Sequence, residues 1–107
     1  MTSALWSHAE AEAATAGRAT AAWTASGVSI DSRSVAPGEL FIAIRGDNGD
    51  GHRFVGDALA KGAAAAMVAE DWQDVPAEAP LLVVRNTDAG LADLARAARA
   101  RTAAKIV

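Results

Sequence analysis

Residues 27–54, GVSIDSRSVAPGELFIAIRGDNGDGHRF, decide the fold of this 107-residue chain. Val28–Asp31 is β-branched and alternating, which predicts a strand, and Leu40–Ile44 is a continuous apolar run typical of a buried strand. Pro37-Gly38 between them fits the centre of a type II turn. Three glycines fall within residues 46–51, which predicts a loop. The stretch therefore predicts two strands joined by a turn and followed by a polar loop.

Further elements are predicted on both sides of this stretch. Ser7 and Glu10 have the spacing of a capping box, which predicts a helix to about Thr15. Other strands are expected in short apolar or β-branched runs, and other helices where apolar residues recur at helical spacing. The predicted strands are 20–23, 65–69, 81–84 and 104–107, and the predicted helices run from Asp50 to Gly62 and from Asp88 to about Arg101. This order indicates a single α/β domain with a mixed β-sheet of about four to five strands flanked by helices.

Composition narrows the class of protein. The net charge of −3 argues against a dedicated nucleic-acid binder, which usually carries a basic excess. The chain has no cysteine, and therefore no disulfide framework or thiolate metal site. His8 and His52 lie far apart in the sequence, so no metal site is expected. No apolar run approaches the length of a membrane span, and no secretory signal is visible, so we expect a cytoplasmic protein.

Asp31-Ser32-Arg33 is the first segment that could bind a ligand, because it stands where a predicted strand ends. Ser32 offers a hydroxyl that donates and accepts, and Arg33 offers a planar fork suited to phosphate or carboxylate. The alternative is a simple turn, in which Asp31 caps the backbone and Arg33 pairs with an acid.

Residues 46–51 are the second such segment, since glycine-rich backbone can present N–H donors to a polar group. The alternative is an ordinary connection between strand and helix. Asp50 is assigned to helix capping and His52 to a structural role. Trp23 is expected in the core, and Trp6 and Trp72 are expected to be partly exposed. No motif of a catalytic nucleophile or of a phosphate-binding loop is present, so no catalytic residue is assigned.

The order of these residues resembles the N-terminal domain of the Mur ligases. The pattern of that family is Asp-Ser/Thr-Arg, Pro-Gly, Leu-Phe-x-Ala, Gly, Asp-Gly/Ala-His with an aromatic residue two positions later, and a Gly-Ala pair after a helix. Its counterparts here are Asp31-Ser32-Arg33, Pro37-Gly38, Leu40-Phe41-Ile42-Ala43, Gly46, Asp50-Gly51-His52, Phe54 and Gly62-Ala63. The match extends over essentially the whole chain.

The resemblance implies a function in peptidoglycan biosynthesis. Mur ligases are cytoplasmic amide ligases that use ATP and Mg²⁺ to convert an acyl carboxylate into an acyl phosphate, which an amine then attacks. Their N-terminal domain holds the UDP end of the substrate, and other domains bind ATP and the incoming amine. Residues 1–107 would then be the UDP-binding domain alone, without a cofactor of its own. A strand like Lys105–Val107 would lead into the phosphate-binding loop of a following domain.

The same resemblance assigns candidate contacts to the UDP moiety. These are Ile30 and Ser32, the loop Asp47-Asn48-Gly49, and Arg33 as either a contact or a structural residue. Within the family, the ligase that adds D-alanyl-D-alanine to UDP-N-acetylmuramoyl-tripeptide is favoured, because residues 96–105 (RAARARTAAK) lack the aromatic-proline signature of the sister enzyme. The alternatives are that sister enzyme, which adds the third peptide residue, and a stand-alone nucleotide-sugar-binding module.

Overall fold

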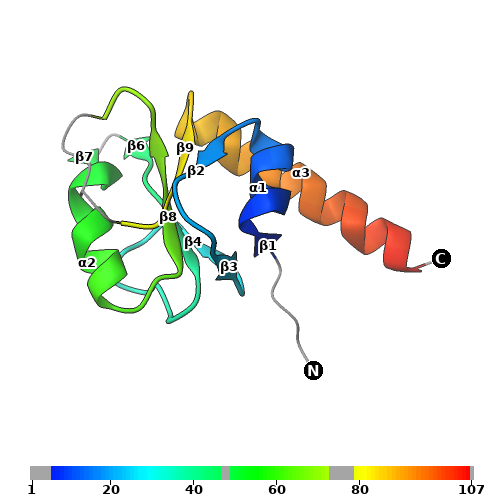
Figure 1. The fold of residues 1–107 in the computed structure, drawn as a ribbon, viewed down its shortest axis with the longest axis horizontal. Helices are drawn as coiled ribbons and strands as arrows, with labels where there is room; N and C mark the ends of the chain where they lie inside the picture. Colours follow the sequence, from blue (N-terminus) through cyan, green and yellow to red (C-terminus); the bar gives the residue numbers. More distant parts are fainter. Residues whose placement is uncertain (1–5, 47–48, 73–78, 107) are drawn as a thin grey trace.

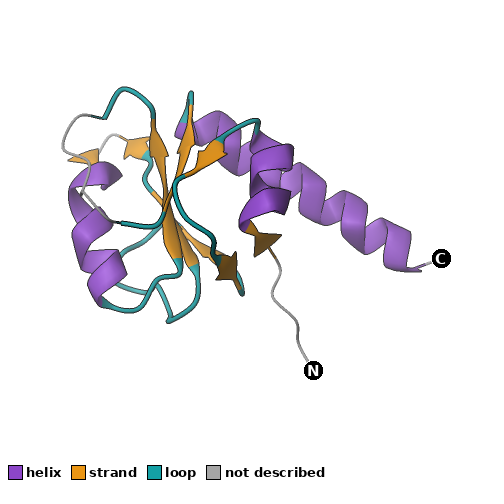
Figure 2. Cartoon of the chain, viewed as in Figure 1, coloured by secondary structure: helices purple, strands orange, loops and turns teal. Residues whose placement is uncertain are grey.

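The chain forms three layers, with a central sheet between helices. The structure is a computed structural model that describes residues 6–46, 49–72 and 79–106. In Figures 1 and 2, helix α2 (Val55–Ala60) lies on one side of the sheet, and α1 (His8–Thr15) and α3 (Thr87–Ile106) lie on the other. The predicted mixed α/β domain is confirmed.

The main sheet has five strands in the order β2-β9-β8-β5-β4. Strands β4 (Val28–Ser29), β5 (Leu40–Ile42), β8 (Ala65–Ala69) and β9 (Leu81–Val84) run parallel to one another. Strand β2 (Arg18–Ala19) is antiparallel to β9 and forms one edge of the sheet. The sheet is therefore mixed, as the sequence predicts.

The central strands are continuously apolar because both faces of the sheet are covered. Side chains alternate between the faces, so Leu40 and Ile42 join one cluster while Phe41 joins the other. The neighbouring strands repeat the pattern, with 65, 67, 82 and 84 in the first cluster and 66, 68 and 81 in the second. Two apolar cores result, one on each side of the sheet.

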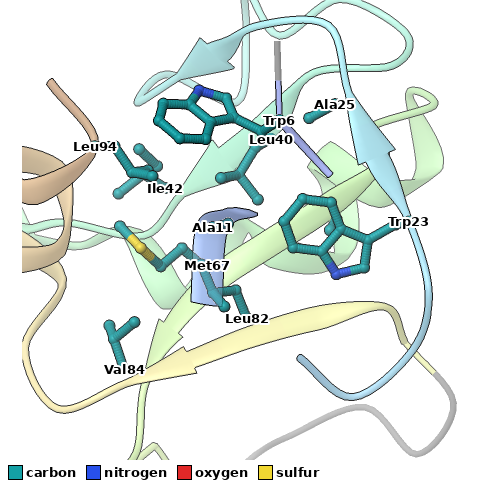
Figure 3. Packing of buried hydrophobic residues seen from close by; sticks show 11 residues of the cluster. Trp6, Ala11, Trp23, Ala25, Leu40, Ile42, Met67, Leu82, Val84 and Leu94 are labelled. Atoms are coloured by element: carbon teal, nitrogen blue, oxygen red, sulfur yellow. The ribbon is translucent and has the colours of Figure 1, made fainter. Parts of the chain in front are cut away.

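Helices α1 and α3 cover the first core. The predicted capping box is confirmed, since the Ser7 hydroxyl accepts from the Glu10 N–H and the Glu10 carboxylate accepts from the Ser7 N–H. Trp23 lies in this core as predicted, with 7% of its surface exposed. The prediction that Trp6 is partly exposed is wrong: it is 4% exposed, because β1 (Trp6–Ser7) pairs with β3 (Thr24–Ala25) beside the same cluster (Figure 3).

The second core lies under α2 and the turn that precedes β5. The predicted type II turn is confirmed, with Gly38 at φ +88° and a hydrogen bond from the Glu39 N–H to the Ala36 carbonyl. The 3₁₀ turn η1 (Gly51–Phe54) leads into α2, which ends before Gly62 at φ +101°. Trp72 is half-buried against this core, as predicted.

Two predicted strands are wrong. Residues 20–23 lie between β2 and β3, and Thr20 instead bonds to Leu81 through its N–H and its hydroxyl. Residues 104–106 continue α3 instead of starting a strand, while Val107 lies outside the described residues. Ala and Lys are strong helix formers, and each residue added to a helix needs only a local hydrogen bond, whereas a strand needs a neighbour.

Candidate functional site

The carboxyl ends of the parallel strands β4, β5, β8 and β9 lie at one edge of the sheet. This edge is the usual place for ligands in α/β proteins. Ile30 and the Asp31-Ser32-Arg33 segment follow β4, and residues 45–50 follow its neighbour β5. The two segments singled out in the sequence therefore leave adjacent strands at the same edge.

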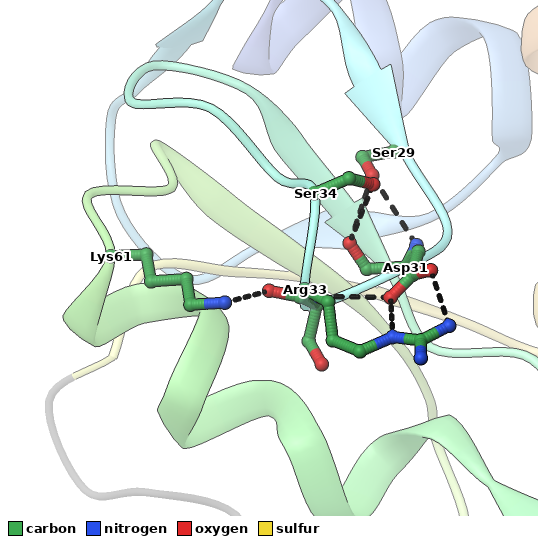
Figure 4. A network of polar contacts seen from close by, with 6 residues as sticks. Ser29, Asp31, Arg33, Ser34 and Lys61 are labelled. Atoms are coloured by element: carbon green, nitrogen blue, oxygen red, sulfur yellow. Dashed lines mark hydrogen bonds and ion pairs between the residues drawn. The ribbon is translucent and has the colours of Figure 1, made fainter.

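Asp31 and Arg33 form a closed local turn (Figure 4). The Asp31 carboxylate accepts from the Arg33 backbone N–H at 2.8 Å, from Nε at 3.2 Å and from Nη2 at 3.1 Å. The Arg33 side chain is nevertheless 88% exposed. The turn in which Asp31 caps the backbone and Arg33 pairs with an acid is therefore present, and the acid is Asp31 itself, while ligand binding by Arg33 stays a prediction.

Ser32 is held through its backbone and leaves its hydroxyl available. Its carbonyl oxygen accepts from Lys61 Nζ at 2.7 Å, which ties the turn to the end of α2 (Figure 4). Within the described ranges the Ser32 hydroxyl has no hydrogen-bond partner. The preceding Ile30 is 59% exposed. This segment therefore presents a free hydroxyl beside an exposed aliphatic side chain.

Part of the predicted loop at residues 46–51 is paired as the two-stranded stem of a hairpin. Strands β6 (Arg45–Gly46) and β7 (Gly49–Asp50) are antiparallel, with Gly46 opposite Gly49. Of the predicted loop contacts, Gly49 lies in this stem, and Asp47 and Asn48 lie outside the described residues. The Gly51 N–H donates to the Ile44 carbonyl at 2.8 Å and fixes the stem to the end of β5.

Asp50 and His52 have the structural roles that the sequence predicts. The Asp50 carboxylate caps the 3₁₀ turn by accepting from the His52 N–H at 2.9 Å. It also contacts His52 Nδ1 at 2.6 Å, and His52 Nε2 accepts from the Ala69 N–H at 2.9 Å. The imidazole is 2% exposed. Both of its nitrogens are engaged, so it does not face solvent as a general base.

Lowering the pH should remove the contribution of Asp31 to stability. Hydrogen bonds from the Arg33 side chain and backbone hold the pKa of Asp31 below its ordinary value. A carboxyl with a lowered pKa in the fold stabilises above its unfolded pKa, and the effect is lost as the pH falls through the folded pKa. Asp31→Asn should therefore be slightly less stable than the wild type near neutral pH and equally stable in strong acid, with a small difference because the pair is exposed. Urea unfolding across this pH range measures the difference, and a difference that does not change with pH would contradict the expectation.

A groove that the sequence did not reveal lies at the same edge, beside β9. It has a volume of about 520 Å³, and its walls include Arg18, Glu70 and Arg85 and the turn from α1 to β2. Glu70 follows β8 and Arg85 follows β9, while Arg18 lies opposite Val83 on the neighbouring strand. No sequence signal points to this groove, because strand pairing brings together three side chains from distant segments.

The described residues include no group of three His, Cys, Asp or Glu side chains that could hold a metal ion. In the same part of the chain, no helix is both long and apolar enough to span a membrane.

Comparisons with known proteins point to one family. Residues 24–99 match the family model described as "Mur ligase family, catalytic domain". UDP-N-acetylmuramoyl-L-alanyl-D-glutamate–2,6-diaminopimelate ligase of Chlorobium phaeobacteroides is 48% identical over 84 residues, which cover 78% of this chain and 16% of that protein. The chain thus spans about a sixth of the length of this relative.

Solved structures give the same family. MurF from Acinetobacter baumannii superimposes with a TM-score of 0.69 at 28% identity, covering 83% of this chain and 20% of that one. MurF from Thermotoga maritima, solved in complex with ADP, superimposes with a TM-score of 0.56 at 32% identity. The match covers 64% of this chain and 16% of the Thermotoga chain.

Proposed function

Because this chain belongs to the Mur ligase family, we propose that it is the domain that holds the UDP end of a UDP-N-acetylmuramoyl peptide. The protein containing it would be an ATP-dependent amide ligase of peptidoglycan biosynthesis. The proposal depends on two neighbouring groups at the carboxyl edge of the sheet: a Ser32 hydroxyl without a hydrogen-bond partner among the described residues, and an exposed Ile30 side chain. This edge is where α/β proteins commonly bind nucleotides.

Each candidate residue would make a particular contact with the nucleotide. The Ile30 side chain offers an apolar surface for the flat face of the uracil, and burying it removes apolar area from water. The Ser32 hydroxyl can donate to or accept from the base or ribose. Asp47, Asn48 and Gly49, which follow β6 in the sequence, would supply further polar contacts.

Arg33 has a more limited part. Its Nε and Nη2 already bind Asp31, so a bidentate grip on a phosphate would require that pair to open. The remaining donors of the exposed guanidinium can approach the diphosphate without breaking the turn. We therefore propose a secondary, electrostatic contact for Arg33.

The chemistry of the ligase would take place outside this chain. Residues 1–107 would supply UDP binding and orientation, whereas ATP and Mg²⁺ would be bound by the remainder of a longer protein. Support comes from the length of the chain, which covers 16% of the diaminopimelate ligase and 20% of the Acinetobacter MurF.

Two amine substrates are candidates for the ligase reaction. The absence of an aromatic-proline signature in residues 96–105 favours D-alanyl-D-alanine added to UDP-N-acetylmuramoyl-tripeptide, which is the MurF reaction. The higher identity to a diaminopimelate ligase, 48% against 28% for MurF of Acinetobacter, favours addition of the third residue to the dipeptide substrate. We give more weight to the addition of the third residue, because the sequence identity extends over 84 residues, whereas the aromatic-proline signature involves only a few residues.

Replacing Ser32 with alanine should weaken binding of the UDP-sugar peptide about two- to tenfold, the usual value of one neutral hydrogen bond. Isothermal titration of this chain with the UDP-sugar peptide measures the loss. Asn48→Ala should weaken binding similarly. Ser34→Ala is the matched control, since Ser34 lies in the same turn and its hydroxyl approaches the Asp31 carbonyl at 3.5 Å. Equal affinities for the wild type, Ser32→Ala and Asn48→Ala would show that the site is misplaced.

The amine substrate can be identified by measuring phosphate release from ATP in the protein that contains this chain. UDP-N-acetylmuramoyl-dipeptide with diaminopimelate, and UDP-N-acetylmuramoyl-tripeptide with D-alanyl-D-alanine, are the two substrate pairs to compare. Turnover with the first pair alone identifies a third-residue ligase, and turnover with the second alone identifies MurF. Binding of the UDP-sugar without turnover of either pair would favour a stand-alone binding module.

A further inference from the structure

The side chain of His52 connects the candidate hairpin to the strand beyond it. His52 follows β7 by two positions, and 2% of its surface is exposed. Its ring packs against Trp72, with the ring centroids 5.2 Å apart. A polar ring this deeply buried needs partners for both nitrogens, or desolvation would destabilise the fold.

Both partners are present, and they determine where the proton lies. The Ala69 backbone N–H can only donate, so Nε2, at 2.9 Å, must carry a lone pair. The proton of the neutral ring is then on Nδ1, which donates to the Asp50 carboxylate at 2.6 Å. The ring is therefore a neutral Nδ1–H imidazole that links Asp50 to Ala69.

This link spans the base of the hairpin. Asp50 is the last residue of β7, and Ala69 is the last residue of β8, two strands of different sheets. The Ala69 carbonyl in turn accepts from the Trp72 N–H at 3.1 Å, which places the Trp72 turn over the imidazole. The stem is thus held at two places. The Gly51 N–H bonds to Ile44, which follows β5, and the His52 ring bonds to Ala69 at the end of β8.

We propose that His52 is a positioning residue, which sets the hairpin stem at the distance from the Ser32 turn that the UDP moiety requires. This inference rests on the proposed function. The imidazole does not touch the nucleotide; it acts through Asp50 and the β7 backbone. A rigid second support of this kind is what keeps binding groups within a fraction of an ångström of their productive geometry.

Substitutions at His52 separate its two bonds. His52→Gln can still accept from the Ala69 N–H, His52→Asn can still donate to Asp50, and His52→Phe keeps a ring but makes neither bond. His8→Phe is the matched control, because it also removes a histidine that accepts from a backbone N–H, that of Trp23 at 3.4 Å, on the other face of the sheet.

The experiment is a nuclear magnetic resonance titration of the ¹⁵N-labelled chain with uridine diphosphate. We expect His52→Phe to raise the dissociation constant about tenfold, because a displaced stem no longer holds its binding groups in the productive geometry. We expect His52→Gln to restore most of the affinity and His8→Phe to leave it unchanged. The wild-type imidazole should show a protonated Nδ1 and an unprotonated Nε2. The inference is wrong if a folded His52→Phe variant binds uridine diphosphate as tightly as the wild type does. It is also wrong if the wild-type ring is protonated at Nε2 and not at Nδ1.

Two further readouts keep the outcomes distinct. If His52→Phe does not fold, His52→Asn decides, because it loses the bond to Ala69: affinity equal to that of the wild type would overturn the inference. If the wild type itself does not bind uridine diphosphate, the proposed function fails, and amide exchange then tests the positioning. The Gly51 and Ala69 amides, which bond to Ile44 and His52, should exchange faster in His52→Phe. Unchanged protection would contradict a link through the imidazole.

Discussion

Gly51→Ala should displace the hairpin and abolish most of the affinity for UDP. A Cβ at Gly51 would lie 2.9 Å from the Ile44 nitrogen, 3.0 Å from the Ile44 oxygen and 3.3 Å from the Ala43 Cα. All of these are backbone atoms of the two residues that follow β5, so the hairpin must move instead. Overpacking of this kind costs about 1–3 kcal/mol of stability, and a displacement of about 1 Å in a binding group can cost on the order of a hundredfold in function.

Gly56→Ala is the control for this substitution. Gly56 lies in α2, five positions along the chain, and a Cβ there would meet no atom within 4 Å. Alanine in a helix is favoured over glycine by up to about 1 kcal/mol. Urea unfolding and titration with uridine diphosphate should therefore show opposite effects on stability, with affinity lost only at Gly51. If both variants behave alike, the close approach between the hairpin and β5 does not matter.

Phe41→Ala should have the largest effect on stability. The ring is 1% exposed at the centre of the second core, between the sheet and α2. Removing a buried phenylalanine costs about 3–5 kcal/mol, which is a large share of the roughly 5–15 kcal/mol that stabilises an ordinary domain. We expect a marked fall in the midpoint of urea unfolding, with much of the protein unfolded at about 37 °C.

Val28→Ala is the matched apolar truncation. Val28 lies on the adjacent strand β4 but is 40% exposed, so little buried contact is lost. Its unfolding free energy should change by about 0.5 kcal/mol. A Phe41 variant as stable as the Val28 variant would mean that the second core does not hold α2 to the sheet.

Much of the fold follows from local patterns in the sequence. The continuous apolar runs at 40–42 and 81–84 form the buried parallel strands, and the Ser7–Glu10 spacing forms the capping box. Short edge elements are harder to predict, because pairing rather than propensity decides them. Trp6 illustrates this: it is buried because a two-residue strand pairs with Thr24–Ala25, a contact between segments distant in the sequence.

The place of the candidate segments in the fold was predictable, whereas their side-chain contacts were not. Asp31, Ser32 and Arg33 stand after a strand, and the edge of the sheet where they lie follows from that order. Arg33 donates to Asp31, and Lys61 donates to the Ser32 carbonyl. Both bonds depend on side-chain geometry, which the spacing of residues in the sequence does not determine. The same holds for His52: its motif indicates a structural residue, but its partner Ala69 is 17 positions away in the sequence.

A map of backbone amide shifts during titration with uridine diphosphate shows where this chain binds the nucleotide. If the chain holds the UDP end of its substrate at the carboxyl ends of β4 and β5, the largest shifts will fall on Ile30–Arg33 and Gly49–Gly51. Shifts concentrated instead around Arg18 and Arg85, at the groove beside β9, would contradict it.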